Sequence, residues 1–212
     1  MISALTGLAL ISAFLTIRAR YTGPPQRVWV FKPVTMIFIL WIAWISGNSH
    51  PDAYNLLILS GLFFSLAGDV FLMLPKDRFL PGLVSFLVAH VFYILAFTRG
   101  TGFGCTGWIA GCIALTGIVM AVLLAPHAGR MKLPVVFYMA VILVMAWQAF
   151  ERWNRVRQGS ALFVVAGALL FLASDSLLAW NRFRRPFRSA EALKLGSYFL
   201  AQWLIALSAG YG

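Results

Sequence analysis

The sequence predicts an all-α integral membrane protein in which eight transmembrane helices form one bundle. Of its 212 residues, 61% are hydrophobic and only 11% are charged, whereas about a quarter of the residues in a soluble domain are charged. The apolar residues run in stretches of about 20, the length that crosses a bilayer core. Short polar breaks separate these stretches. Residues 1–212 are therefore predicted to form a single polytopic transmembrane domain, with no segment left for a soluble one.

The first four spans are predicted at residues 2–17, 28–47, 54–74 and 79–98. The first has no basic region before it and no small-residue cleavage site, so we interpret it as a span rather than a removable signal peptide. The basic, proline-containing run at 18–27 separates it from the second. A polar break near Pro51 and another at 75–78 bound the third, and an Arg-Gly-Thr-Gly run ends the fourth.

The last four spans are predicted at residues 103–125, 132–150, 160–180 and 190–209. Pro126 ends the fifth, the polar run that begins at Glu151 ends the sixth, and an arginine-rich run ends the seventh. Within the fifth, Gly107 and Gly111 have the spacing that lets membrane helices approach closely. We expect them to pack against another helix of the same chain. Dimerisation through them stays open, so the oligomeric state, monomer or dimer, is undetermined.

The Lys and Arg residues are unevenly divided between the two ends of the predicted bundle. Because cytoplasmic loops are enriched in these residues, both termini are predicted to be non-cytoplasmic. The net charge of +11 is then explained by topology and by anionic membrane lipids, not by nucleic acid. Arg99, Arg152, Arg155 and Arg157 fall at one end. The other 13 fall after spans one, three, five and seven: Arg18, Arg20, Arg27, Lys32, Lys76, Arg78, Arg130, Lys132, Arg182, Arg184, Arg185, Arg188 and Lys194.

Only two of the six acidic residues lie well inside predicted spans. Asp69 is six residues before Pro75, and Asp175 is six residues before Asn181. At 1.5 Å per residue both carboxylates lie about 9 Å from the cytoplasmic end. An acid among lipid tails is costly unless it faces the bundle interior, so the pair predicts a functional site. The flanking residues also match at an offset of half the chain, which leaves open a duplicated four-helix unit.

Other polar residues of the spans approach from the same end. On the last span, Lys194, Tyr198 and Gln202 form one stripe at i, i+4 and i+8. We therefore predict a polar cavity that opens to the cytoplasm and is lined by spans two, three, four, six, seven and eight. The remaining polar residues assigned to it are Lys32, His90, Tyr93 and Tyr138. No metal site is expected, since His50 and His127 lie in loops on opposite sides.

Several segments of the sequence resemble the YhhN family of lysoplasmalogenase-like membrane proteins. The most specific is the Ser-Asp-Ser-Leu-Leu-Ala run that begins at Ser174. The resemblance covers spans two to eight. It is carried by residues 32–33 (KP), 68–73 (GDVFLM), 86–93 (FLVAHVFY), 134–138 (PVVFY), 167–181 (GALLFLASDSLLAWN) and 198–202 (YFLAQ).

This resemblance implies a hydrolase that cleaves the vinyl ether bond of lysoplasmalogen-type lysophospholipids, giving a fatty aldehyde and a glycerophospho-headgroup. No cofactor is expected. Two nearby acids suit this chemistry, because their environments can keep one protonated as a general acid and the other ionised. Asp69 and Asp175 are the predicted pair, in an order that the sequence does not fix. We expect His90, Tyr138, Tyr198 and Gln202 to orient them or the water. Lys32, Asn181, Arg182 or Lys194 is expected to hold the phosphate at the cytoplasmic mouth, and Tyr93 is a further predicted substrate-binding residue.

Two other function classes stay open. The same aspartates would suit a proton-coupled transporter of small molecules or lipids. A lipid-binding scaffold would not need them at all. Short loops and a basic inner face fit a bacterial inner membrane, which is the expected location. The headgroup and chain length of the substrate are not determined by the sequence.

Overall fold

The computed structural model describes residues 1–47, 52–75 and 77–211, and within them the fold is all-helical, as predicted. Lys76 and His50, which enter the charge count and the metal argument above, lie outside the described residues. Three short 3₁₀ turns, Ala125–His127, Gly129–Met131 and Ala209–Tyr211, accompany eight α-helices. The helices are α1 (Ile2–Tyr21), α2 (Gln26–Gly47), α3 (Ala53–Met73), α4 (Phe79–Thr98), α5 (Gly107–Leu124), α6 (Lys132–Val156), α7 (Gly159–Phe183) and α8 (Ala190–Ser208).

The predicted spans match these helices to within a few residues except at the end of α1, the start of α5 and the end of α6, where the difference is largest. The sixth span was expected to end at residue 150, with Glu151 at its edge, but α6 continues to Val156 and Glu151 is only 2% exposed. Its carboxylate accepts hydrogen bonds from the backbone N–H and the hydroxyl of Thr106 and from the indole N–H of Trp147. These donors satisfy a buried acid, which a hydropathy pattern cannot foresee.

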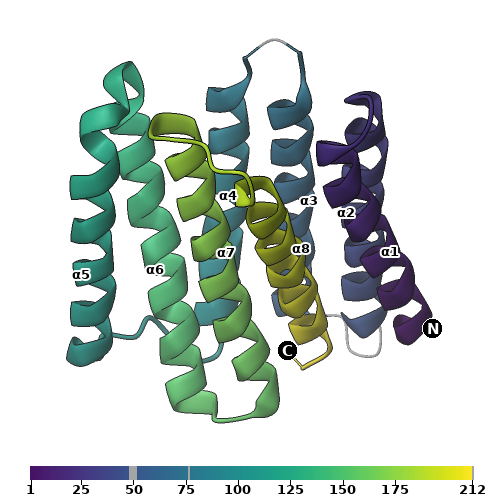
Figure 1. Cartoon of the computed structure of the whole chain (residues 1–212). Coiled ribbons are helices and arrows are strands. Elements are labelled where there is room, and N and C mark those ends of the chain that lie inside the picture. Colours follow the sequence, from purple (N-terminus) through teal and green to yellow (C-terminus); the bar gives the residue numbers. More distant parts are fainter. Residues whose placement is uncertain (48–51, 76, 212) are drawn as a thin grey trace.

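Six of the helices form a closed ring (Figure 1). Around it, α2 packs on α3, α3 on α4, α4 on α6, α6 on α7, α7 on α8, and α8 on α2. The other two helices lie outside the ring, α1 against α2 and α8, and α5 against α6 and α7. Each half of the chain thus contributes three ring helices and one outer helix, in the same order. This equivalence supports the duplication that the sequence left open.

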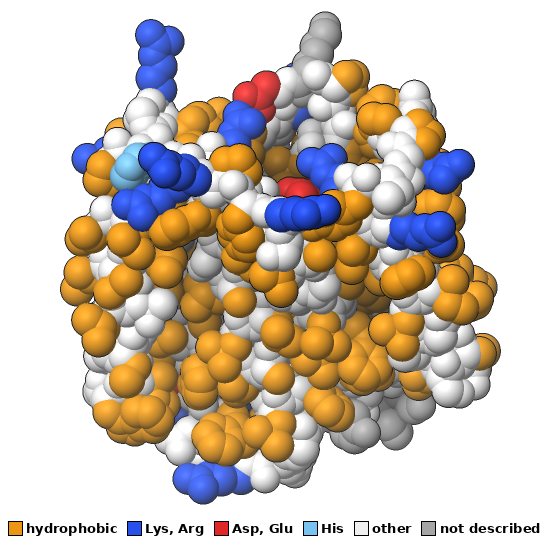
Figure 2. All heavy atoms as spheres, in the orientation of Figure 1, with side chains coloured by type: hydrophobic (Ala, Val, Ile, Leu, Met, Phe, Trp, Pro, Cys, Tyr) orange, Lys and Arg blue, Asp and Glu red, His pale blue; other side chains and the backbone are white. Residues whose placement is uncertain are grey.

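The outer surface fits a lipid environment. Seven of the helices are long and apolar enough to cross a membrane, and apolar side chains cover the sides of the molecule between ends that carry Arg and Lys (Figure 2). The eighth, α8, does not meet this criterion because it carries Glu191, Lys194 and other polar residues. It packs against α1, α2, α3 and α7, so its polar side chains face protein. The chain is a multi-pass integral membrane protein.

Glycines allow close packing between helices, but not at the expected place. A Cβ added at Gly61 of α3 would overlap the ring of Tyr93 of α4, and one at Gly68 would overlap the ring of Phe86. By contrast, a Cβ added at Gly107 or Gly111 would meet nothing within 4 Å. The expectation that these two residues pack within the chain is wrong. Small-residue contacts characteristic of membrane helices lie instead between α3 and α4 and between α7 and α8, where a Cβ added at Gly167 would lie 3.1 Å from the Ala201 carbonyl oxygen.

Candidate functional site

A cavity of about 520 Å³ opens at the end of the bundle where the 13-cation loops gather, and it holds both membrane aspartates. Its walls come mainly from α2, α3, α7 and α8, with Arg20 of α1 and Phe79 and Phe86 of α4. The predicted site residues that line it are Lys32, Asp69, Asp175, Asn181, Arg182, Lys194 and Tyr198. The prediction that α6 lines this cavity is wrong, and α1, which was not predicted, does contribute.

Asp69 lies at the inner end of the cavity and is 1% exposed. The Lys32 ammonium lies 2.7 Å from its Oδ1, and the Tyr198 hydroxyl donates to its Oδ2 at 2.7 Å. Lys32 is itself only 8% exposed. A buried charge is tolerated when it is paired and hydrogen-bonded, so this geometry favours an ionised Asp69. Lys32 was expected to hold a phosphate, but its closest partner is this carboxylate.

Asp175 has a different environment. Its Oδ2 accepts a hydrogen bond from the Tyr138 hydroxyl, and its side chain is partly exposed to the cavity. Among the described residues no Lys, Arg or His forms an ion pair with it. The two carboxylates therefore share one cavity and differ in their partners, a cation for Asp69 and a neutral hydroxyl for Asp175.

The two aspartates are held in equivalent ways by the two halves of the chain. Lys32 reaches Asp69 from α2 to α3, and Tyr138 reaches Asp175 from α6 to α7. Lys32 and Tyr138 are 106 residues apart, and so are Asp69 and Asp175. This is the offset of the matching sequence pattern in the two halves. The site thus consists of two related helix pairs facing each other, in which a lysine of one half corresponds to a tyrosine of the other.

Three predicted site residues lie deeper than the cavity and do not line it. The Tyr93 hydroxyl donates to the Gln202 side-chain oxygen at 2.8 Å, and both residues are fully buried. His90 is also fully buried, with its ring centroid 4.7 Å from that of Phe171 and 5.3 Å from that of Tyr138. Neither of its ring nitrogens has a hydrogen-bond partner within the described structure. His90 therefore lies behind Tyr138, one residue away from the Asp175 carboxylate.

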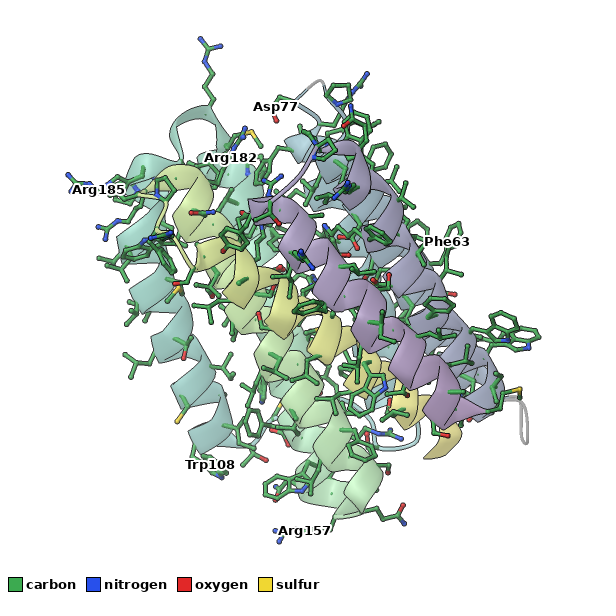
Figure 3. The ribbon with its side chains drawn as sticks, turned by 45° about the vertical axis from the view of Figure 1, so that its right-hand side comes forward. Phe63, Asp77, Trp108, Arg157, Arg182 and Arg185 are labelled. Carbon is green, nitrogen blue, oxygen red and sulfur yellow. The ribbon has the colours of Figure 1, made fainter. Side chains whose placement is uncertain are left out.

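The mouth of the cavity is a network of alternating charges. Glu191 accepts from Lys194 at 2.6 Å, from Arg20 at 2.8 Å and from the Asn181 amide at 3.1 Å. The remaining pair there, Arg182 and Asp77, is 2.6 Å apart, and the two side chains meet between α7 and the α3–α4 connection (Figure 3). The hydrogen bond from Arg182 holds the pKa of Asp77 below its usual value.

Two residues of this site, Glu191 and Ser174, were not predicted from the sequence. Glu191 lies at the start of the last predicted span and was given no role in the site, although its spacing of three from Lys194 on a helix is that of an ion pair. Ser174, beside Asp175, lines the cavity and donates to the backbone carbonyl of Lys194. Ser174 begins the most specific segment of the family resemblance, but no role was predicted for it. Within the described ranges, no three His, Cys, Asp or Glu side chains lie close enough together to hold a metal ion.

Comparison with known proteins gives one family match and several relatives. The YhhN family model matches residues 27–209. The chain is 29% identical over 198 residues to an Escherichia coli O157:H7 protein named uncharacterized membrane protein YhhN, covering 93% of this chain and 94% of the relative. It is 34% identical over 188 residues to human lysoplasmalogenase TMEM86A, covering 82% and 74%. Human lysoplasmalogenase TMEM86B is 34% identical over 189 residues, covering 87% and 77%. No solved structure matches significantly.

Proposed function

The chain belongs to the YhhN family, and from this premise we propose that it hydrolyses the vinyl ether bond of lysoplasmalogen-type lysophospholipids. The observation that carries the proposal is the pair of aspartates in one cavity, of which one has a cationic partner and the other has none. The names of the human relatives support the substrate class. The cavity supports it as well, because it opens at one end of a membrane bundle where a lipid headgroup would lie.

Asp175 is the general acid in this proposal. Because no cation of the described structure is bonded to Asp175, its protonated form costs less free energy in this position than its ionised form. It protonates the β-carbon of the vinyl ether, which leaves an oxocarbenium-like cation at the carbon bonded to oxygen. Tyr138 fixes the orientation of the carboxyl group through its hydroxyl. Asp69, ionised beside Lys32, lies in the same cavity and stabilises the developing positive charge.

Water completes the reaction. Asp69 orients the water and accepts its proton as the oxygen adds to the cation, giving a hemiacetal. As the hemiacetal collapses, Asp175 accepts its hydroxyl proton and Asp69 returns a proton to the glycerol oxygen, which leaves as an alcohol. The aldehyde forms and both carboxyl groups regain their starting protonation states. In sum, one vinyl ether and one water give one fatty aldehyde and one glycerophospho-headgroup, with no redox change. Glycosidases divide acid and base work between two carboxylates around a similar cation.

The charged mouth suits a headgroup that carries both signs of charge. Arg182, Lys194 and Arg20 are placed to bind a phosphate, while Glu191 and Asp77 are placed to bind an ammonium. In the structure these groups neutralise one another. The phosphate of a zwitterionic headgroup can pair with the cations and its ammonium with the carboxylates, so that no charge is left unpaired. A purely anionic headgroup would take the cations and leave the two carboxylates without partners.

The test is aldehyde release by the purified, detergent-solubilised protein. We expect release from a 1-alkenyl lysophospholipid and none from the 1-alkyl analogue, which lacks the double bond that accepts the proton. Absence of release, under conditions where a known lysoplasmalogenase is active, would contradict the proposal. The aspartates would then point to proton-coupled transport, which reconstituted vesicles with a trapped pH indicator would detect.

A further inference from the structure

A second pocket meets the polar cavity at Asp175. It lies between α4, α5, α6 and α7, and it shares Phe79, Asp175 and Leu178 with the cavity. Its lining contains no Lys or Arg. Apart from Asp175, the polar side chains in it are those of Tyr138 and Ser176. The remaining lining residues are Leu83, Met120, Leu124, Val135, Met139, Ile142, Leu143, Leu172, Ala179 and Phe183.

This apolar groove runs along the membrane normal. On α6 its lining extends from Val135 to Leu143, a rise of about 12 Å. Tyr138, which bonds to Asp175, lies within that stretch. A molecule with its polar end in the cavity and an aliphatic chain in the groove would therefore have the junction between them beside the Asp175 carboxyl. In a lysoplasmalogen, that junction is the vinyl ether.

The outer wall of the groove is the helix that is held least firmly. Only Ile109 and Leu124 of α5 are buried. Its non-cytoplasmic end is anchored, because Gln148 bonds to the backbone of Gly104 and Glu151 bonds to Thr106. Its other end continues into short 3₁₀ turns, where a Cβ added at Gly129 would meet nothing. This other end, which lines the groove, is held by apolar contacts such as those of the buried Leu124, so it can move more easily than the end tied by hydrogen bonds.

The groove is narrow as it stands. Its free volume is about 30 Å³, enough for about two water molecules. A hydrocarbon chain needs more space, and the side chains that fill the groove include Met120 and Met139, which adapt their shape easily. An uncharged groove of this width suits a single aliphatic chain.

We propose that this groove binds the single aliphatic chain of the lipid substrate, and that outward movement of α5 admits the chain from the bilayer. The proposal rests on the proposed function for the identity of the lipid. It adds where the chain lies, which helix moves and why a one-chain lipid is selected. The groove residues Met139 and Leu143 then become determinants of chain length.

Photolabelling locates the chain without relying on hydrolysis. The probe is a 1-alkyl lysophospholipid that carries a diazirine in the middle of its chain. We expect labelled peptides from α5 and α6 around Met120, Met139 and Leu143, and we expect an excess of unlabelled long-chain lysophospholipid to prevent this labelling. Labelling spread over the outward faces of α1 and α2, without competition, would overturn the proposal.

A blocking variant tests specificity. Met139→Trp fills the groove, and Phe137→Trp is the matched control, because Phe137 lies on the same helix and is 63% exposed. We expect Met139→Trp to reduce groove labelling at least tenfold, and to reduce kcat/KM at least tenfold for a long-chain alkenyl substrate but less than twofold for a four-carbon one. Equal loss with both chain lengths would contradict a chain-binding role. If the wild type labels in the groove yet releases no aldehyde, the proposed function fails and the chain site stands.

A reversible cross-link tests the movement of α5. A Cβ at Gly117 would lie 2.7 Å from the Leu143 side chain, so Gly117→Cys with Leu143→Cys joins α5 to α6 when oxidised. The exposed, free residues Cys105 and Cys112 are replaced by Ser in this background. We expect groove labelling to be lost in the oxidised protein and restored by reductant. Labelling that is equal in both states would show that α5 does not move to admit the chain.

Discussion

At the scale of single residues, the site depends on the Lys32–Asp69 pair. The two side chains are 2.7 Å apart and almost fully buried. Removing one partner of such a pair leaves a charge without compensation, which costs about 3–5 kcal/mol. Asp175 is not bound to a cation in this way. This difference between two similar carboxylates is the basis of their separate roles in the proposed reaction.

Lys32→Met is therefore expected to lower the thermal stability in detergent and to reduce activity about 100-fold. The double variant Lys32→Met/Asp69→Asn, in which neither charge remains, should regain most of the stability while staying inactive. Lys132→Met, at an exposed cation that begins α6, is the control and should change neither property. A double variant as unstable as the single one would show that the ion pair is not what stabilises this part of the bundle.

The sequence predicted the depth of the site residues better than their contacts. Equal distances from span ends placed Asp69 and Asp175 together correctly, because helix rise is regular. Which partner each meets depends on the rotation and tilt of neighbouring helices, which a hydropathy pattern leaves undetermined. Lys32 and Asn181 were accordingly assigned to a phosphate, while the structure pairs them with Asp69 and Glu191.

At the scale of the elements, the contact between α3 and α4 positions the residues that lie deeper than the cavity. Gly61 lets the Tyr93 ring approach α3, and Tyr93 in turn donates a hydrogen bond to Gln202 of α8. Because Gly61 has no side chain, α3, α4 and α8 come together at this position. On the outer helix α5, by contrast, a Cβ at Gly111 would meet nothing, although one at Gly117 would contact the Leu143 side chain of α6.

Gly61→Ala is expected to destabilise the protein by about 1–3 kcal/mol, because the added methyl group must push the Tyr93 ring aside. Gly111→Ala is the matched control and should be neutral or slightly stabilising, since alanine favours the helix more than glycine. Thermal unfolding of both variants in the same detergent measures the difference. Equal melting temperatures would contradict the close packing of α3 on α4.

The helices could be located from sequence, but their packing could not. Apolar runs separated by basic or proline-containing breaks gave all eight helices to within a few residues, except at the start of α5 and the ends of α1 and α6. The helix α6 extends beyond its apolar run because Thr106 and Trp147 satisfy Glu151. That contact joins residues 45 positions apart, and no local pattern reveals it.

At the scale of the whole molecule, the ring of six helices with one outer helix per half explains why the two aspartates face each other. Each half supplies one acid and one partner for it from the preceding ring helix. The halves differ where the proposed chemistry needs a difference, with lysine in one and tyrosine in the other. The cavity opens at the end that carries most of the cations, which we propose to be cytoplasmic.

This orientation can be tested by labelling single cysteines in a background without Cys105 and Cys112. Arg185 and Arg157 lie at opposite ends of the bundle (Figure 3). An impermeant maleimide is applied to cells whose inner membrane is intact and whose outer membrane has been made permeable. We expect Gln158→Cys, next to Arg157, to react. Arg185→Cys should react only after the membrane is disrupted. The reverse pattern would place the cavity on the other side of the membrane.

The central claim is that Asp69 and Asp175 together cleave a vinyl ether, and the most direct measurement is aldehyde release by wild type, Asp69→Asn and Asp175→Asn. Asp52→Asn is the matched control, because Asp52 caps α3 far from the cavity and asparagine caps equally well. We predict that each site variant, folded and monodisperse, loses at least 100-fold in kcat, while Asp52→Asn retains wild-type activity. Near wild-type release by either site variant would contradict the claim.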